Sequence, residues 1–136
     1  PVSSPQSLRG LSILIVDDEQ DAREVLRALL EHCGARVLSA ASAQEAIALL
    51  DKEPPDILVS DIGMPDEDGY SLIGRVRARR PDHGGRIPAV ALTAYASSQD
   101  RARALARGFN DHVTKPVQAG ELLAVLASRA ERFGLR

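Results

Sequence analysis

Residues 55–69 read PDILVSDIGMPDEDG, and the rest of the chain can be arranged around this stretch. The apolar run at 57–59 is typical of a strand buried on both faces of a parallel sheet. Asp61 follows where that strand should end, and the glycine- and proline-containing segment 63–69 then predicts a loop. Open α/β sheets place their functional groups at the carboxyl ends of strands, so Asp61 is a candidate functional residue. Taken alone, it would more simply be a strand cap or the start of a turn.

Composition indicates one ordinary globular domain. The chain has 136 residues, of which 44% are hydrophobic and 26% charged, with a formal net charge of -2. That balance gives no reason to expect direct nucleic-acid binding or membrane contact. Cys33 is the only cysteine, so an internal disulfide is excluded and a reducing, cytoplasmic setting fits. We therefore expect a cytoplasmic domain, whether or not its parent protein is anchored to a membrane.

Strand and helix signals alternate along the chain from Leu11 onward, after a Ser- and Pro-rich linker or tail at 1–10. This alternation predicts a mainly parallel sheet with helices on both faces. The flavodoxin-like (βα)5 arrangement, with strand order 2-1-3-4-5, is the common one at this size. The predicted strands are 11–16, 35–40, 56–60, 89–92 and 110–113, and the predicted helices begin near 20, 42, 69, 97 and 119.

Two helix faces carry specific expectations. The arginine-rich side of the third predicted helix should face solvent. Its members are Arg75, Arg77, Arg79 and Arg80. The fourth predicted helix should turn Ala102, Leu105 and Ala106 towards the core, because these residues recur at helical spacing.

Polar residues end or follow four of the predicted strands. Asp17 and Asp18 end the first, Asp61 the third and Thr93 the fourth, while Lys115 follows the fifth. Each alone has a structural explanation as a cap, a turn or a surface loop, but all should converge at one edge of the sheet. Three close carboxylates raise one another's pKa unless a cation is present, and such hard oxygen ligands suit Mg²⁺. With a lysine and a hydroxyl, the set can hold a phosphoryl group on an aspartate nucleophile.

The ordered motifs resemble those of bacterial response-regulator receiver domains. They are VDDE at 16–19, SDIGMPDEDGY at 60–70, LTAYA at 92–96 and TKP at 114–116. Each motif is weak alone, but the ordered set is specific. The resemblance implies one receiver domain over residues 11–133, nearly the whole chain.

The resemblance also implies roles for individual residues. Asp61 would accept a phosphoryl group from a partner's phosphohistidine. Asp18, Asp61 and the Gly63 backbone carbonyl would ligate Mg²⁺ directly, and Asp17 would act mainly through a metal-bound water. Thr93 would bond the phosphoryl oxygen.

Lys115 would pair with the phosphoryl group, and the resemblance implies a cis bond between Lys115 and Pro116, which proline permits at modest cost. One position departs from the family pattern, and two bear on the attacking water. His112 stands where relatives usually have the aromatic residue that turns inward on activation. Tyr95 and Gly63 flank the water's path, so the phosphoryl lifetime does not carry over from relatives.

The implied partner is a histidine kinase or a histidine phosphotransfer domain, and the domain itself would catalyse only its own phosphorylation and dephosphorylation. Because the chain ends just after the fifth helix and has a Ser- and Pro-rich leader, we expect the C-terminal receiver of a hybrid sensor histidine kinase. The alternative is a stand-alone response regulator or phosphoryl shuttle. The oligomeric state does not follow from the sequence.

Two other classes fit less well. A flavodoxin-like FMN protein needs a phosphate-binding loop after the first strand, where DDEQD at 17–21 would repel phosphate. An aspartate-nucleophile phosphatase of the haloacid-dehalogenase type needs a second Asp two residues after the first, and that position is Gly63.

Overall fold

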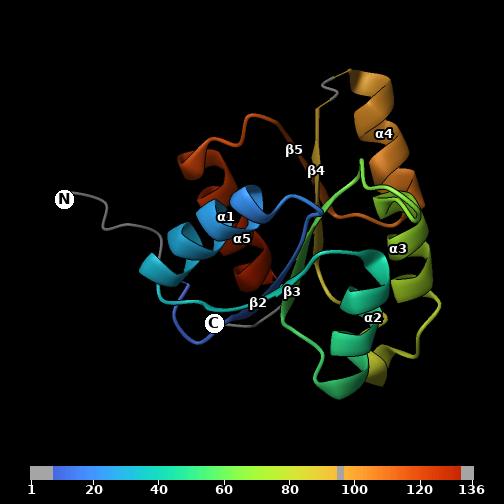
Figure 1. Ribbon diagram of the computed structural model, residues 1–136, viewed down its shortest axis with the longest axis horizontal. Coiled ribbons are helices and arrows are strands. Elements are labelled where there is room, and N and C mark those ends of the chain that lie inside the picture. Colours follow the sequence, from blue (N-terminus) through green and yellow to red (C-terminus); the bar gives the residue numbers. More distant parts are fainter. Residues whose placement is uncertain (1–7, 95–96, 133–136) are drawn as a thin grey trace.

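The computed structural model describes residues 8–94 and 97–132. Five strands form one parallel sheet in the order β2-β1-β3-β4-β5 (Figure 1). The predicted fold class, a flavodoxin-like (βα)5 sheet, is therefore confirmed. The strands are β1 Ser12–Val16, β2 Arg36–Ala40, β3 Ile57–Asp61, β4 Ala89–Thr93 and β5 Asp111–Thr114.

Helices cover both faces of the sheet. Figure 1 shows α1 and α5 on one face and α2, α3 and α4 on the other. The helices are α1 Gln20–His32, α2 Ala43–Lys52, α3 Gly69–Arg77, α4 Ser98–Arg107 and α5 Ala119–Arg132, with a short 3₁₀ turn, η1, at Pro81–His83. Among the helices described, none combines the length and apolar content needed to cross a bilayer.

Each face of the sheet has its own hydrophobic core. The central strands β3 and β4 are buried along their whole length, because helices cover them on both sides. Local sequence signals start the helices on the second face. The amide of Glu45 donates to Ser42 Oγ at 3.1 Å, and Glu45 Oε1 accepts from the Ala41 amide at 2.9 Å. This pairing closely follows the capping box that the sequence predicts.

The packed part of the chain includes Leu8. The sequence places this residue in the linker or tail, yet its side chain is fully buried in the core beneath α1 and α5. Its amide donates to the Cys33 carbonyl at 2.8 Å, and its carbonyl accepts from the Leu11 amide at 3.0 Å. Cys33 itself belongs to this core.

The orientation of α4 differs from the prediction. Ala102, Leu105 and Ala106 are exposed, whereas Ala104 is the one buried residue of the helix. Alanine marks a helix face weakly, because it is small enough to lie on either side. The packing of α4 against α3 and β5 decides which side faces inward.

Arg77 also differs from its predicted exposure. Its side chain is half-buried and donates three hydrogen bonds at the end of the sheet where β4 and β5 begin. Nε binds the Gly108 carbonyl at 2.9 Å, Nη1 binds the Gly85 carbonyl at 3.1 Å and Nη2 binds Asn110 Oδ1 at 3.1 Å. Gly108 and Asn110 lie 31 and 33 residues along the chain from Arg77, so helical periodicity does not predict these contacts.

Candidate functional site

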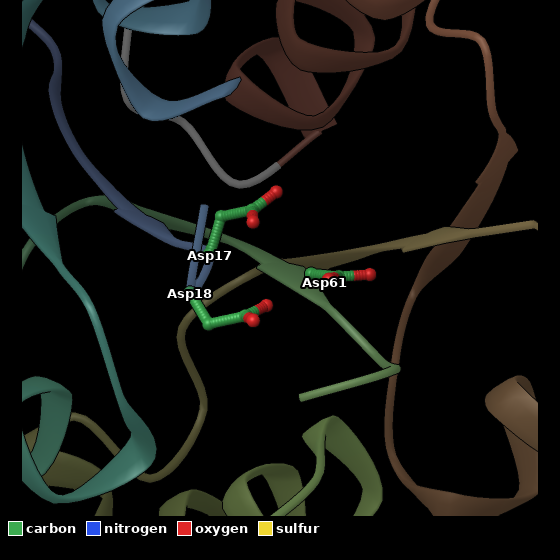
Figure 2. A group of neighbouring side chains, drawn as sticks. All are labelled: Asp17, Asp18 and Asp61. Atoms are coloured by element: carbon green, nitrogen blue, oxygen red, sulfur yellow. The ribbon is translucent and has the colours of Figure 1, made fainter. Parts of the chain in front are cut away.

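Three carboxylates meet at the carboxyl edge of the sheet. Asp17 and Asp18 directly follow β1, and Asp61 ends β3, the neighbouring strand. One oxygen from each carboxylate lies within 4.8 Å of the other two. In Figure 2 all three side chains extend to the same side of the strands. The predicted convergence of these residues is present because parallel neighbours end at a common edge.

Asp17 is held in an unfavourable environment for a charge. Its side chain is buried, and burial raises its pKa, as does the negative charge of Asp61, although a hydrogen bond from the Glu19 amide opposes this rise. Asp17 Oδ1 accepts that bond at 2.9 Å. Asp17 Oδ2 is buried with no hydrogen-bond partner among the described residues.

Lys115 supplies the nearest positive charge. Its Nζ lies 3.1 Å from Asp61 Oδ1 and 3.7 Å from Asp17 Oδ2. Partial burial favours a lower pKa for Lys115, but the hydrogen bond and charge of Asp61 outweigh it and raise the pKa overall. The lysine therefore stays protonated at neutral pH. The Lys115–Pro116 peptide bond is cis, as expected.

The donor set fits a magnesium ion. One ammonium cannot balance three carboxylates, and the buried Asp17 Oδ2 lacks a hydrogen-bond donor among the residues described. Carboxylate oxygens with room for water suit Mg²⁺, which keeps several waters and takes few protein ligands. Asp18 is exposed, whereas Asp17 is buried. Asp18 and Asp61 thus line the open side of the cluster, and Asp17 lies behind them.

A cleft of about 330 Å³ opens over the cluster. Thr93, the last residue of β4, is buried at its wall. A Cβ atom built on Gly63 would meet no atom within 4 Å, so the backbone beside Asp61 is open to an approaching group. Tyr95 lies outside the described residues. The lining residues are Asp18, Glu19, Asp61, Ile62, Gly63, Thr93, Ala94 and Lys115.

His112 lies on β5 opposite Ala91 of β4. Its neighbour Val113 packs in the core under α1 and α5, so strand alternation turns His112 to the face that carries α4. The side chain is partly buried, and its Nε2 atom has no hydrogen-bond partner within the described part of the chain. The structure thus places an unsatisfied imidazole nitrogen on the second residue of β5, three residues before Lys115.

Glu19 was not singled out as a site residue from the sequence. Glu19 lines the cleft, and its charge contributes to the raised pKa of Lys115. A second, largely apolar pocket of about 360 Å³ lies beside the cleft, between α1 and the segment that follows β5. Val25 borders this pocket and is 68% exposed.

Comparison with known proteins agrees with this geometry. The model of the response regulator receiver domain family matches residues 13–127. An uncharacterized 14.6 kDa protein of Leptolyngbya boryana is 50% identical and aligns over 89% of this chain and 91% of its own length. Hybrid signal transduction histidine kinase D of Dictyostelium discoideum is 34% identical over 96% of this chain. The transcriptional regulatory protein PhoP of Escherichia coli is 36% identical over 90% of this chain.

The chain spans only 9% of that kinase and 53% of PhoP, so it corresponds to one part of each. Among solved structures, the receiver domain of a sensor histidine kinase from Pseudomonas aeruginosa, with a magnesium ion in its active site cleft, has a TM-score of 0.80. It is 34% identical, and the match covers 90% of this chain and 98% of that one. A response regulator from Chloroflexus aurantiacus is 32% identical with a TM-score of 0.83, over 90% of this chain and 99% of its own. From its motifs, its fold and these matches, the chain belongs to the response regulator receiver domains of two-component signalling systems.

Proposed function

We propose that Asp61 is the phosphoacceptor of this receiver domain. In the reaction, a carboxylate oxygen of Asp61 forms a bond to phosphorus as the bond between phosphorus and a partner's histidine nitrogen breaks. The imidazole leaves with the electron pair of that bond. One observation carries the assignment: Asp61 lies at the centre of the site, facing the cleft, paired with Lys115 and flanked by two further carboxylates.

The chain's acidic residues have separate roles in this proposal. Asp18, Asp61 and the Gly63 carbonyl hold Mg²⁺, and the buried Asp17 acts through a water on the metal. Mg²⁺, when bound, supplies positive charge that offsets the carboxylates and the transferring phosphoryl group. This division is supported by the exposure of Asp18 and the burial of Asp17.

Lys115 and Thr93 receive the phosphoryl group on the other side. Lys115 is already within 3.1 Å of Asp61, so a short movement lets its ammonium pair with a phosphoryl oxygen. Thr93 ends the adjacent strand β4 at the cleft wall and would donate its hydroxyl. The chain thus catalyses only its own phosphorylation and dephosphorylation.

The partner is a histidine kinase or a histidine phosphotransfer domain, which must bring its imidazole in line with Asp61. We place its docking surface over α1 and the segment after β5. The apolar pocket there, with the exposed Val25 at its border, adjoins the cleft directly. Chemical-shift mapping with a cognate phosphotransfer domain would test this surface, and a footprint confined to α2 and α3 would contradict it.

For the parent protein, we propose a cytoplasmic receiver module at 11–133 within a hybrid histidine kinase, joined through the segment at 1–10. The similarity to the Dictyostelium kinase supports this context. A stand-alone regulator or phosphoryl shuttle uses the same site, and the similarity to the small Leptolyngbya protein favours that second candidate. A kinase core encoded in the same reading frame would establish the first, and a stop codon directly upstream of a short frame would establish the second.

His112 is proposed to take the place of the aromatic residue in the switch. Its unsatisfied Nε2 atom, on the α4 face of the sheet, is the supporting observation. Imidazole nitrogen shifts, recorded with and without beryllofluoride at two pH values, should differ between the two states. Identical spectra would remove His112 from the switch without affecting Asp61.

Phosphorylation itself is tested by incubating the chain with acetyl phosphate and Mg²⁺. Intact mass spectrometry should show one phosphoryl group, which is lost in Asp61→Asn and when a chelator removes the metal. Asp66→Asn is the matched control, because Asp66 is an exposed acid on the same loop, outside the cluster. Undiminished labelling of Asp61→Asn would reject the assignment. Sustained turnover of a general phosphomonoester would instead indicate a phosphatase.

A further inference from the structure

The helix α4 is held to the domain by very little buried surface. Ala104 is its one buried residue, and Leu105, its largest apolar side chain, is 43% exposed. A helix gains most of its stability from packing an apolar face, and a single alanine supplies little of it. Other contacts must therefore fix the position of α4.

Tyr70 provides one such contact. Its ring, at the start of α3, lies under two guanidinium groups from successive turns of α4. The Cζ atom of Arg103 is 4.8 Å from the ring centroid, and that of Arg107 is 5.3 Å away. Both distances are within the range of a cation–π interaction. We call these three residues the Tyr70 clamp.

The two arginines repel each other, and the shared ring offsets part of that cost. They are four residues apart on α4, a spacing at which like charges destabilise a helix. Neither forms an ion pair with a carboxylate among the residues that the structure describes. The ring face of Tyr70 is therefore the feature that holds both side chains against α3.

Through its neighbour Gly69, Tyr70 is rigidly connected to the acceptor residue Asp61. Gly69, its neighbour in α3, donates its amide to the Ile62 carbonyl at 2.9 Å. A Cβ atom on Gly69 would lie 2.6 Å from the Asp61 carbonyl oxygen and 2.8 Å from Ile62 Cα. The start of α3 is thus packed directly on the backbone of Asp61, where no side chain fits between them.

The far end of α4 is fixed separately. Arg77, two turns along α3 from Tyr70, donates to the Gly108 carbonyl directly after α4 and to Asn110 before β5. The restraints from α3 therefore reach the middle and the C-terminal end of α4. The N-terminal end, near Ser97, is the end closer in sequence to Thr93 and the cleft.

We propose that Tyr70 is a positioning residue that couples the state of Asp61 to α4 through Arg103 and Arg107. The inference rests on the proposed function of Asp61. The clamp is closed in the arrangement where Lys115 pairs with the Asp61 carboxylate itself. A phosphoryl group draws Lys115 and Thr93 to new positions, the backbone around Asp61 adjusts, and α3 passes that change to α4 through the ring. The clamp favours the carboxylate arrangement, so weakening it favours the phosphorylated one.

The first test uses beryllofluoride as the phosphoryl mimic, with its affinity measured by calorimetry in Mg²⁺. Arg103→Gln with Arg107→Gln should tighten binding by about two- to fivefold for each contact removed, which follows from the strength of exposed cation–π pairs. By reciprocity, beryllofluoride should increase amide exchange in α4 of the wild-type chain. Arg101→Gln is the matched control, because Arg101 is exposed on the same helix but does not lie over the ring.

The second test changes the ring. Tyr70→Phe keeps the aromatic face and should bind beryllofluoride as the wild type does. Tyr70→Leu should match the double glutamine variant, and combining all three changes should add nothing further. The arginine variants alter exposed side chains, so they report on coupling even if Tyr70→Leu does not fold.

The outcomes separate the two proposals. A wild-type chain that fails to bind beryllofluoride overturns the function proposed for Asp61, and the coupling with it. Normal binding in the wild type, with equal affinity in the double glutamine variant and Arg101→Gln, overturns the coupling alone. So does a loss of thermal stability in the clamp variants with no change in affinity or in α4 exchange, since that describes a purely structural contact.

Discussion

The two ends of the sheet handle buried charge in opposite ways. At the carboxyl end, three carboxylates cluster, and the one lysine beside them pairs with Asp17 and Asp61. Asp17 has a raised pKa and a buried oxygen without a hydrogen-bond partner among the described residues. At the amino end, burial lowers the pKa of Arg77. There, however, all three of its donor nitrogens bind carbonyl or amide oxygens.

This difference in hydrogen bonding distinguishes a ligand-binding site from a structural contact. Unsatisfied buried charge costs stability, and a fold retains it where a ligand will complete it. Satisfied buried charge joins segments that are distant in sequence, and Arg77 joins α3 to the loop before β4 and to the start of β5. Variants at the two ends should therefore respond in opposite directions, and the expected effects are given below from largest to smallest.

Arg77→Met should cause the largest loss of stability. Methionine keeps an unbranched apolar stem but removes the donors, leaving the Gly85 and Gly108 carbonyls without this partner. We expect the free energy of unfolding to fall by about 2–4 kcal/mol, measured by urea denaturation. Arg86→Met, an exposed arginine in the neighbouring loop, should change it by less than about 0.5 kcal/mol. Equal effects of the two substitutions would show that the Arg77 hydrogen bonds add nothing.

Magnesium should raise the free energy of unfolding through the carboxyl end of the sheet alone. At a concentration about one hundred times its dissociation constant, a ligand that binds only the folded state adds about 2.7 kcal/mol. We expect that gain in the wild type and, undiminished, in Arg77→Met, because the two ends share no contacts. Asp18→Asn should lose most of it. A gain that survives in Asp18→Asn would place the ion elsewhere.

Asp17→Asn should stabilise the protein at neutral pH when a chelator is present. Burial raises the pKa of Asp17 above its usual value, so the folded state holds this proton more tightly than the unfolded chain does. The stability from that proton is complete below the unfolded pKa and is lost as the pH rises through the folded pKa.

An asparagine keeps the neutral form at every pH. The variant's advantage in urea midpoint should therefore appear as the pH rises above about 4 and disappear at lower pH. Mg²⁺ should remove the advantage by stabilising the wild type. Asp66→Asn serves as an exposed-acid control, and a lower midpoint for Asp17→Asn at neutral pH would contradict the expected sign.

Lys115→Met should have the smallest effect on stability and a large effect on signalling. The lysine side chain is 29% exposed, whereas its partner Asp61 is 7% exposed. Losing the lysine is therefore tolerated when Mg²⁺ compensates the buried carboxylates. With Mg²⁺ present, we expect a thermal midpoint close to that of the wild type and a reduced response to acetyl phosphate. Unfolding of this variant would identify Lys115 as a structural residue.

The sequence by itself determined the fold class and the main site. Apolar runs buried on both faces specify parallel strands, and a polar residue ending such a run must lie at the carboxyl edge. Strand order and crossover handedness leave few alternatives, so the sequence alone predicts which polar residues meet at this edge. They are Asp17, Asp18, Asp61, Thr93 and Lys115. The capping signal of Ser42 and Glu45 is equally local, and it is confirmed.

Only the tertiary structure decided the contacts between helices and loops. The contacts of Arg77 with Gly108 and of Tyr70 with Arg103 join residues more than thirty positions apart in the chain. Helical periodicity does not predict which arginine binds a carbonyl or an aromatic ring, or which face of α4 is buried. Leu8 likewise lies in a segment whose composition predicts a linker, and only its packing against the end of α1 makes it part of the core. Polar and small residues have weak intrinsic preferences for burial, so the surroundings supplied by the rest of the fold determine where they lie.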